Sequence, residues 1–228
     1  MRARSLAARV VACRRCPRLR AHCRAVAAAW RARRPGAAFW GRPVPGLRSA
    51  RPRLLVVGLA PGALGANRTG RVFTGDASGA WLFRAMHASG FCDRPVSRAR
   101  GDGLRLLDAA VTGAARCAPP DNRPRAAELD ACRPFLVEEV RAFRALRAVV
   151  ALGRIAFDQL RRAWVEAGRA PFPRAAFRHG GAWTAPGPVT LLASYHPSRR
   201  NTQTGLLSRR AFHAVFRRTR WILDKGAR

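Results

Sequence analysis

The chain has 228 residues, and its 48% of apolar residues supports one domain with a hydrophobic core and excludes a disordered charged tail. Basic residues outnumber acidic ones by 44 to 12, which gives a formal net charge of +32. A GC-rich genome would explain the choice of Arg over Lys but not the scarcity of Asp and Glu. We therefore expect a polyanionic partner, with nucleic acid as the first candidate. No stretch of about 18 apolar residues occurs, so we expect no membrane span.

The N-terminal segment, residues 1–49, lacks strand character and holds several cysteines, with one helix expected over residues 21–33. Its basic start is followed by too short an apolar stretch for a signal peptide, so we expect a cytoplasmic protein. In the cytoplasm, cysteines stay reduced or bind metals more often than they form disulfides. We expect residues 1–228 to form a single domain that includes this segment.

Four short apolar runs predict buried strands, at residues 54–58, 109–112, 148–152 and 189–194. Helical patterns accompany them, at residues 78–89, 125–144 with an interruption at Pro134, 155–167 and 206–223. Strands that alternate with helices predict an α/β fold in which helices cover both faces of a mainly parallel sheet. Ligands bind such sheets beyond the carboxyl ends of the strands, so the loops that begin at Gly58, Gly113 and Tyr195 are candidates for the site.

The first of these loops, residues 58–76, is rich in glycine, which lets the backbone approach a ligand closely. It lacks both the Gly-Lys-Ser/Thr ending of a P-loop and the G-x-G-x-x-G spacing of a dinucleotide site, so we do not expect a nucleotide there. Its last residue, Asp76, stands just before an expected helix, so a helix N-cap is the structural alternative to a functional carboxylate. For Phe73 the structural alternative is an ordinary core position.

Two pairs of cysteines are spaced for a shared site. Cys13 and Cys16 form a C-x2-C pair, and Cys117 and Cys132 form a C-x14-C pair about a hundred residues later. The second spacing is too wide for a zinc knuckle, but four cysteines can hold either zinc or an iron–sulfur cluster. Independent core cysteines are the structural alternative, and Cys23 is the main rival ligand.

The third loop begins at Tyr195 and contains His196, which is followed by a rigid proline. A lone histidine usually makes structural hydrogen bonds, but a histidine at the carboxyl end of a strand is a candidate catalytic group. The next polar side chains suit contacts with phosphates and base edges: Arg199, Arg200, Asn201 and Gln203.

Together the three loops resemble the iron–sulfur uracil-DNA glycosylases of family 5, type B, in the uracil-DNA glycosylase superfamily. The matching segments span most of the chain in the right order: residues 58–62, 65–76, 116–124 and 196–205. The resemblance implies a three-layer αβα sandwich around a central four-stranded parallel sheet. It also implies a [4Fe–4S] cluster whose ligands fall on four of the cysteines: Cys13, Cys16, Cys117 and Cys132. That set excludes Cys23 and leaves Cys92 away from the cluster.

The resemblance also implies a role for each loop residue. The catalytic residues would be Asp76, Asn122 and His196; the base-binding residues Gly58, Ala60 and Phe73; and the DNA-binding residues Arg199, Arg200, Asn201 and Gln203. Related families carry an acidic residue or Asn at the position of Ala60, where it positions the attacking water. Because that group is missing here, Asp76 is the expected replacement.

We therefore expect a monofunctional DNA N-glycosylase. It would flip uracil and other deaminated bases, such as hypoxanthine, out of double-stranded DNA and hydrolyse the N-glycosidic bond, which leaves an abasic site. We expect a monomer in the bacterial cytoplasm that associates with the nucleoid when it acts. The alternative is a non-catalytic damaged-DNA-binding protein with an iron–sulfur cluster or zinc, which would not need Asp76 and His196 in one pocket.

Overall fold

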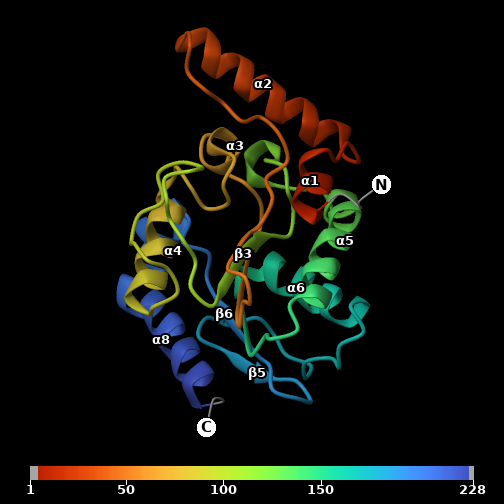
Figure 1. Cartoon of the computed structure of the whole chain (residues 1–228), viewed down its shortest axis with the longest axis vertical. Helices are drawn as coiled ribbons and strands as arrows, with labels where there is room; N and C mark the ends of the chain where they lie inside the picture. The colour runs from red at the N-terminus through yellow and green to blue at the C-terminus, as the bar shows by residue number, and fades with distance from the viewer. Residues whose placement is uncertain (1–4, 226–228) are drawn as a thin grey trace.

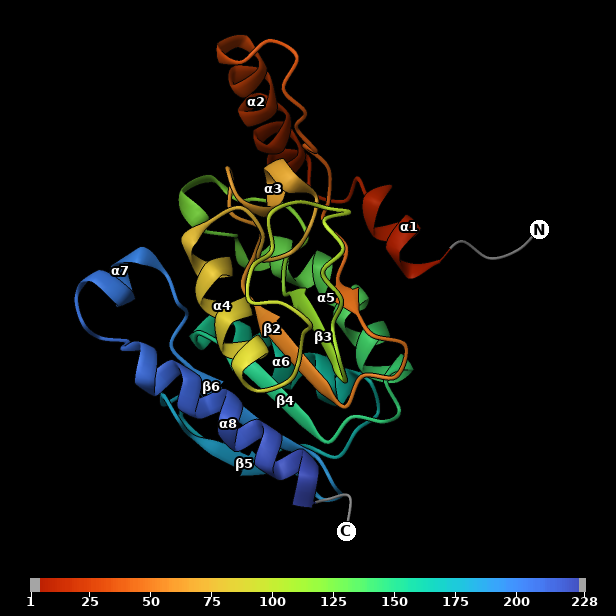
Figure 2. The ribbon, with the colours of Figure 1, turned by 60° about the vertical axis from the view of Figure 1, so that its left-hand side comes forward.

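A computed structural model of the chain describes residues 5–225 (Figure 1). Its elements, in chain order, are α1 (Leu6–Val11), α2 (Pro17–Arg33), β1 (Leu47–Arg48), β2 (Leu54–Gly58), α3 (Ala66–Thr69), α4 (Ala77–Ala88), β3 (Ala109–Gly113), the 3-10 helix η1 (Pro120–Asn122), α5 (Ala126–Ala142), β4 (Ala148–Leu152), α6 (Arg154–Glu166), β5 (Ala182–Thr184), β6 (Thr190–Ser194), α7 (Arg199–Gln203) and α8 (Arg209–Lys225). Figures 1 and 2 show α4 and α8 on one face of a central sheet and α5 and α6 on the other. The predicted α/β fold with three layers is confirmed.

Within residues 5–225 the sheet has six strands in the order β1-β3-β2-β4-β6-β5. The four central strands are parallel, as predicted, whereas β1 and β5 are short antiparallel edge strands that the sequence did not predict. Gly58 of β2 lies opposite Gly113 of β3, and Leu152 of β4 lies opposite Ser194 of β6. The parallel strands therefore end at one edge of the sheet, where the three candidate loops begin.

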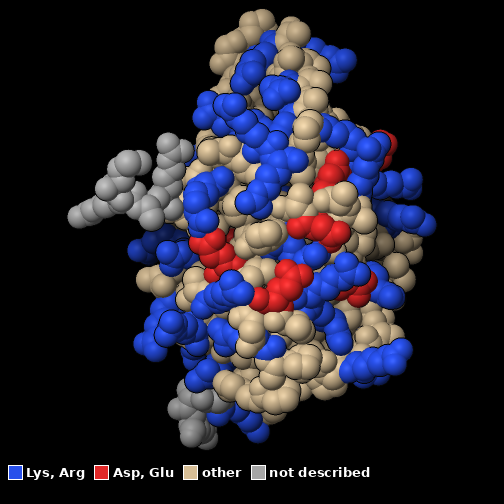
Figure 3. Space-filling view, turned by 90° about the vertical axis from the view of Figure 1, so that its right-hand side faces the viewer, with Lys and Arg blue, Asp and Glu red and all other residues tan. Residues whose placement is uncertain are grey.

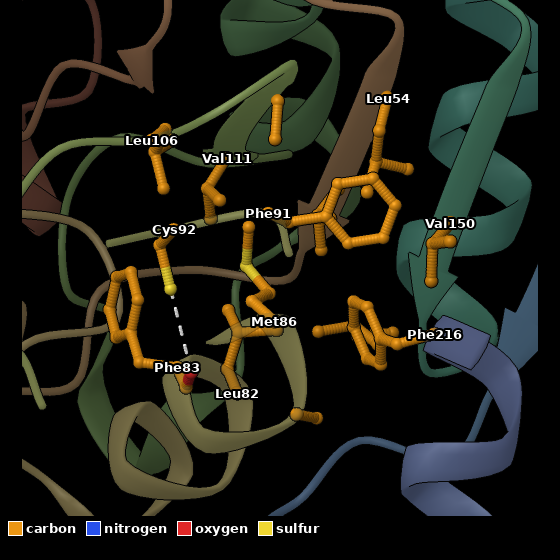
Figure 4. Packing of buried hydrophobic residues seen from close by; sticks show 14 of the residues in the cluster. Leu54, Leu82, Phe83, Met86, Phe91, Cys92, Leu106, Val111, Val150 and Phe216 are labelled. Atoms are coloured by element: carbon orange, nitrogen blue, oxygen red, sulfur yellow. Dashed lines mark hydrogen bonds between the residues drawn. The ribbon is translucent and has the colours of Figure 1, made fainter. Parts of the chain in front are cut away.

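Both faces of the sheet are apolar, which is why the central strands are continuous hydrophobic runs. Leu54 of β2 belongs to a core cluster with α4 and α8, and its neighbour Leu55 belongs to a second cluster with α5 and α6. Figure 4 shows the first cluster, in which Phe216 of α8 lies near Val150 of β4 and Phe83 of α4 lies beside Cys92. Burial of one such side chain contributes about 1.5–3 kcal/mol.

Some helix boundaries differ from the predictions. α5 continues through Pro134, although a proline removes one helical hydrogen bond. The helix persists because its apolar face, with Leu136 and Val140, is buried against the second core cluster. α2 begins earlier than expected, at Pro17, because a proline at the first helical position loses no hydrogen bond. Within residues 5–225, every helix is too short or too polar to span a bilayer.

Candidate active site

The loop after β2 brings Phe73 back over the end of its own strand. Phe73 has a left-handed backbone conformation, with φ of 51°, which is uncommon for a residue other than glycine. Its ring lies so close to Gly58 that a β-carbon added there would be 2.4 Å from Phe73 Cζ. The ring also stacks on the imidazole of His196, with ring centroids 5.9 Å apart and planes inclined by 27°. Two residues predicted from different loops are thus in contact.

Asp76 is a helix cap and also a neighbour of the glycine-rich turn. Its Oδ1 accepts a hydrogen bond of 2.9 Å from the backbone N–H of Gly79, so Asp76 caps α4, as the structural alternative proposed. Its Oδ2 lies against the preceding turn, where a β-carbon on Gly65 would be 2.1 Å from this oxygen and one on Gly62 would be 2.8 Å from it. Oδ1 therefore caps the helix, and the absence of side chains at Gly62 and Gly65 leaves space for Oδ2.

The carboxylate of Asp76 also acts electrostatically on His196. Burial lowers the pKa of His196, and the negative charge of Asp76 opposes this effect by raising it. Because the burial effect is larger, the pKa lies below the ordinary value of 6.5 and the imidazole is neutral at neutral pH. A neutral imidazole offers one N–H donor and one acceptor.

The backbone of His196 is held in place by the residues that follow it. The His196 carbonyl accepts hydrogen bonds of 2.8 Å from Asn201 Nδ2 and 2.8 Å from the backbone N–H of Ser198. Just before it, the backbone N–H of Tyr195 donates to His179 Nδ1 over 3.3 Å. Asn201, predicted as a DNA contact, therefore positions the histidine through its side-chain amide.

Two other predicted residues lie outside this group. Asn122 is exposed on η1 with φ of 56°, and no hydrogen bond joins it to Asp76 or His196 in the part of the chain that the structure describes. Ala60 is partly buried, and its peptide N–H and C=O have no hydrogen-bond partner within residues 5–225. The Gly58 carbonyl, by contrast, already accepts a hydrogen bond of 2.9 Å from the backbone N–H of Ala114.

The polar loop after His196 contains the short helix α7. Three of its predicted DNA contacts are exposed there: Arg199, Arg200 and Gln203. Just beyond this helix, Leu206 has 54% of its surface exposed. Leu206 was not among the candidates predicted from the sequence, although an apolar side chain after a polar run of Arg, Asn, Thr and Gln is a usable signal.

A second site lies where the turn between α1 and α2 meets α5 and the loop after β3. One small pocket there is lined by the four predicted ligands: Cys13, Cys16, Cys117 and Cys132. Cys92 lies elsewhere, in the first core cluster, where its Sγ donates to the carbonyl of Phe83 over 3.6 Å (Figure 4). Arg18 of α2 pairs with Glu128 of α5 through two contacts of 2.8 Å, which fixes the N-terminal segment beside this pocket.

Cys23, the rival ligand, lies behind the pocket. It is fully buried, does not line the pocket, and its Sγ donates to the carbonyl of Ala118 over 3.7 Å. A hydrogen bond between the sulfurs of Cys23 and Cys117 raises the pKa of Cys117, and burial raises it further. The same hydrogen bond lowers the pKa of Cys23. Cys23 thus contacts one predicted ligand but does not face the pocket that all four share.

The chemistry of the pocket suits an anionic cluster. Burial raises the pKa of Cys16 and raises that of Cys132 to about 11, so these thiols keep their protons until a metal replaces them. Arg116 is buried among them, is paired with Glu139, and has an Nε without a partner in the described residues. No group of three or more His, Cys, Asp or Glu side chains within residues 5–225 is close enough together to hold one metal ion. A four-iron cluster instead takes each thiolate on a separate iron.

The chain is similar to known proteins over most of its length. The family described as "Uracil DNA glycosylase superfamily" matches residues 45–220, a span that includes Phe73, Asp76 and His196. A type-5 uracil-DNA glycosylase of Thermus thermophilus is 48% identical over 206 residues, which cover 90% of this chain and 91% of that protein. A protein of the same description from Pyrobaculum aerophilum is 45% identical over 92% of this chain and 88% of its own length. Another, from Mycobacterium tuberculosis, is 45% identical over 93% of this chain and 78% of its own length.

Proposed function

Because the chain belongs to the type-5 uracil-DNA glycosylases of the uracil-DNA glycosylase superfamily, we propose that it removes uracil from DNA as a monofunctional N-glycosylase. The reaction hydrolyses the bond between the base and deoxyribose and leaves an abasic site. The observation that carries this proposal is the convergence of Phe73, Asp76 and His196 at the carboxyl edge of the parallel strands. A non-catalytic DNA-binding protein would not need this convergence.

Phe73 supplies the surface on which the flipped base stacks. The base does not fit between the rings of Phe73 and His196, because two stacked contacts need roughly 7 Å, twice the carbon contact distance of ~3.5 Å. The ring centroids are only 5.9 Å apart, so the base lies on Phe73 with one edge toward the imidazole. The peptide groups of Ala60, which have no partner in residues 5–225, bind its polar edge, and Gly58 contributes by leaving room for the Phe73 ring. Flipping costs a few kcal/mol, which this binding offsets.

His196 assists departure of the base. Cleavage of the glycosidic bond moves an electron pair onto the base and leaves a sugar with oxocarbenium character. The neutral imidazole donates its N–H to an oxygen of the base, which stabilises the developing anion. One donor of this kind is worth about 3 kcal/mol, or about a hundredfold in rate.

Asp76 acts on the sugar side of the reaction. Its Oδ1 is used by the helix cap, so Oδ2 stabilises the positive sugar or orients the attacking water. Asn122 is exposed, and it would hold the base or the water only after its loop moves toward bound DNA. The main chemical contribution therefore falls to Asp76 and His196.

The loop that carries α7 binds the duplex. Arg199, Arg200 and Gln203 are exposed and suit contacts with phosphates and base edges in the minor groove. Leu206 is the apolar side chain that fills the gap left in the base stack. Asn201 keeps the loop and His196 in a fixed relation through its hydrogen bond to the His196 carbonyl.

The cysteine pocket would hold a [4Fe–4S] cluster through Cys13, Cys16, Cys117 and Cys132. Such a cluster, when bound, links two segments that lie about a hundred residues apart in the sequence, and no redox step is required of it. The chain's own contribution is the unpartnered Nε of Arg116, which places a positive charge beside the thiolates.

The proposal extends to other deaminated bases in double-stranded DNA, such as hypoxanthine. The position of Ala60 carries no polar side chain, so fewer groups in the pocket select for one base. We further propose that the protein acts as a monomer in the bacterial cytoplasm and associates with the nucleoid.

The test is release of uracil from a uracil-containing duplex under single-turnover conditions, with the abasic site detected by alkaline strand cleavage. Binding of the duplex without any base release would favour the non-catalytic alternative. Visible absorption of anaerobically purified protein distinguishes iron from zinc, because only iron–thiolate cluster chemistry gives colour.

A further inference from the structure

A second basic surface lies on the two helices that cover one face of the sheet. A pocket of about 360 Å³ opens between α4 and α8, which lie side by side in Figures 1 and 2. Six residues line it: Trp81, Arg84, Arg209, Arg210, His213 and Arg217. None of the proposed catalytic, base-binding or cluster-binding residues belongs to this pocket.

This pocket concentrates positive charge without a compensating carboxylate. No Asp or Glu lines it, and none of its four arginines forms an ion pair within residues 5–225. A groove beside β1 and the start of β2 differs, because it contains Asp108, Glu138 and Glu139, and Arg53 there is paired with Asp108. Figure 3 likewise shows acidic groups set among the basic ones on the face to the right in Figure 1. The pocket thus differs from that groove in having no acidic group among its lining residues.

The aromatic ring of Trp81 also lines the pocket and is held by contacts on both sides. Trp81 packs edge-on against the buried Phe212, with ring centroids 6.1 Å apart. The guanidinium of Arg209 lies 5.7 Å from the centre of the Trp81 ring, which holds this cation in place at the pocket. Burial lowers the pKa of His213, and the positive charges of Arg217 and Arg209 lower it further. Together these side chains form a site of positive potential before any ligand binds.

The pocket lies beside the proposed DNA surface. α4 starts directly after Asp76, so Trp81 and Arg84 stand roughly 8 Å and 12 Å from Asp76 along the helix axis, at 1.5 Å per residue. α8 follows the loop that carries α7, and Arg209 is its first residue. Both sides of the pocket therefore start next to loops of the proposed site, α4 after Asp76 and α8 after the α7 loop.

We propose that the pocket between α4 and α8 binds backbone phosphates of the duplex that flanks the excised base. The inference rests on the proposed function, because that function places the flipped base at Phe73. The phosphates of a DNA strand would reduce the repulsion among the four arginines. Arg84 would contact them from α4 and Arg217 from α8. The contact adds affinity and fixes the duplex on one side of the lesion without taking part in the chemistry.

The experiment compares the double variant Arg84→Gln/Arg217→Gln with a control that loses the same charge, Arg144→Gln/Arg174→Gln. Arg144 and Arg174 are exposed and lie outside the pocket. Affinity for an undamaged duplex is measured over a range of salt concentrations. We expect the pocket variant to bind about tenfold more weakly at low salt. The slope of the logarithm of the binding constant against the logarithm of the salt concentration should be shallower by about 0.9 for each lost phosphate contact. The control should lose much less affinity.

Duplexes shortened on either side of a central uracil locate the contact. Shortening one side should weaken binding of the wild type and of the control, but not of the pocket variant. Cleavage at saturating enzyme, measured in parallel, tests the proposed function separately and should be equal in all three proteins. If the wild type cleaves uracil while the pocket variant keeps the control's affinity and salt dependence, the phosphate site is overturned and the glycosylase proposal stands. If no protein releases uracil, the proposed function fails, whatever the affinities are.

Discussion

The ring of Phe73 stacks on the imidazole of His196, with centroids 5.9 Å apart, and its other edge fills the space that a side chain at position 58 would occupy. The strand end, the aromatic ring and the histidine thus form one packed unit. Because each member fixes the next, a change at Gly58 reaches His196 through Phe73.

Gly58→Ala tests this packing. The new β-carbon would lie 2.4 Å from Phe73 Cζ, so the ring must move away from its place beside His196. We expect uracil release to slow by at least about tenfold, with a loss of stability of about 1–3 kcal/mol from overpacking. Single-turnover rates and urea unfolding measure the two effects. In a Phe73→Ala background the same substitution should have almost no further effect, and a full additional loss would contradict the contact.

Asp76→Asn separates the cap of α4 from the chemistry. Asn caps helices about as well as Asp, so the melting temperature should change little. The loss of negative charge beside the sugar should slow single-turnover cleavage by about a hundredfold or more. A variant that cleaves at the wild-type rate would leave Asp76 as a cap only and would move the catalytic assignment to Asn122.

Asn201→Ala removes the side-chain donor to the His196 carbonyl. A hydrogen bond of this kind contributes about 1 kcal/mol, so we expect the rate at saturating enzyme to fall by about fivefold to tenfold. DNA affinity should stay within about twofold, because the amide is used inside the protein. Titration of enzyme under single-turnover conditions gives both values, and Gln203→Ala serves as the control on the same helix. A loss of affinity without a loss of rate would instead make Asn201 a DNA contact.

Acid should destabilise the protein below about pH 7. Burial lowers the pKa of His196 and of His179, whereas an unfolded chain titrates near 6.5. Between the folded and the unfolded pKa the unfolded chain binds more protons, so stability decreases as the pH falls through this window. At His179 this loss of stability has an identifiable structural origin, because a doubly protonated ring cannot accept the hydrogen bond from the backbone N–H of Tyr195. Melting temperatures from pH 7.5 to 5 should decrease in the wild type and decrease less in His179→Asn, whose amide oxygen keeps an acceptor. Identical profiles would count against this assignment.

Substitution of Cys132 should lower both the iron content and the thermal stability of the protein. Its thiol lines the pocket with the other three proposed ligands, so Cys132→Ala should reduce bound iron and lower the melting temperature of the purified protein. Cys23→Ala is the matched control, because Cys23 is buried next to the pocket but does not line it. Iron content and visible absorption are the measurements. Equal loss of iron in the two variants would restore Cys23 as a ligand.

The core of the fold could be predicted because its strands are uniform apolar runs, of which residues 148–152 are an example. The edge strands β1 and β5 could not, because two or three residues carry too little pattern and are fixed by pairing with a neighbour, as Trp183 is with Leu191. The sequence identified Asp76 and His196 through their loops. It could not show that the two oxygens of Asp76 have separate tasks, or that Asn201 faces the histidine backbone, because both depend on tertiary contacts.

The cysteine pocket draws its four thiols from both ends of a long stretch of chain, and this sets an order of events during synthesis. Cys13 and Cys16 leave the ribosome first, and the pocket is complete only after Cys132 has followed. Before α5 is made, α2 has no Glu128 to pair with Arg18, and Cys13 and Cys16 lack Cys132 as a neighbour in the pocket. If the four cysteines hold the proposed cluster, iron that arrives before α5 is made meets at most three of its four ligands, and synthesis of α5 sets the earliest moment at which the cluster can be fully bound.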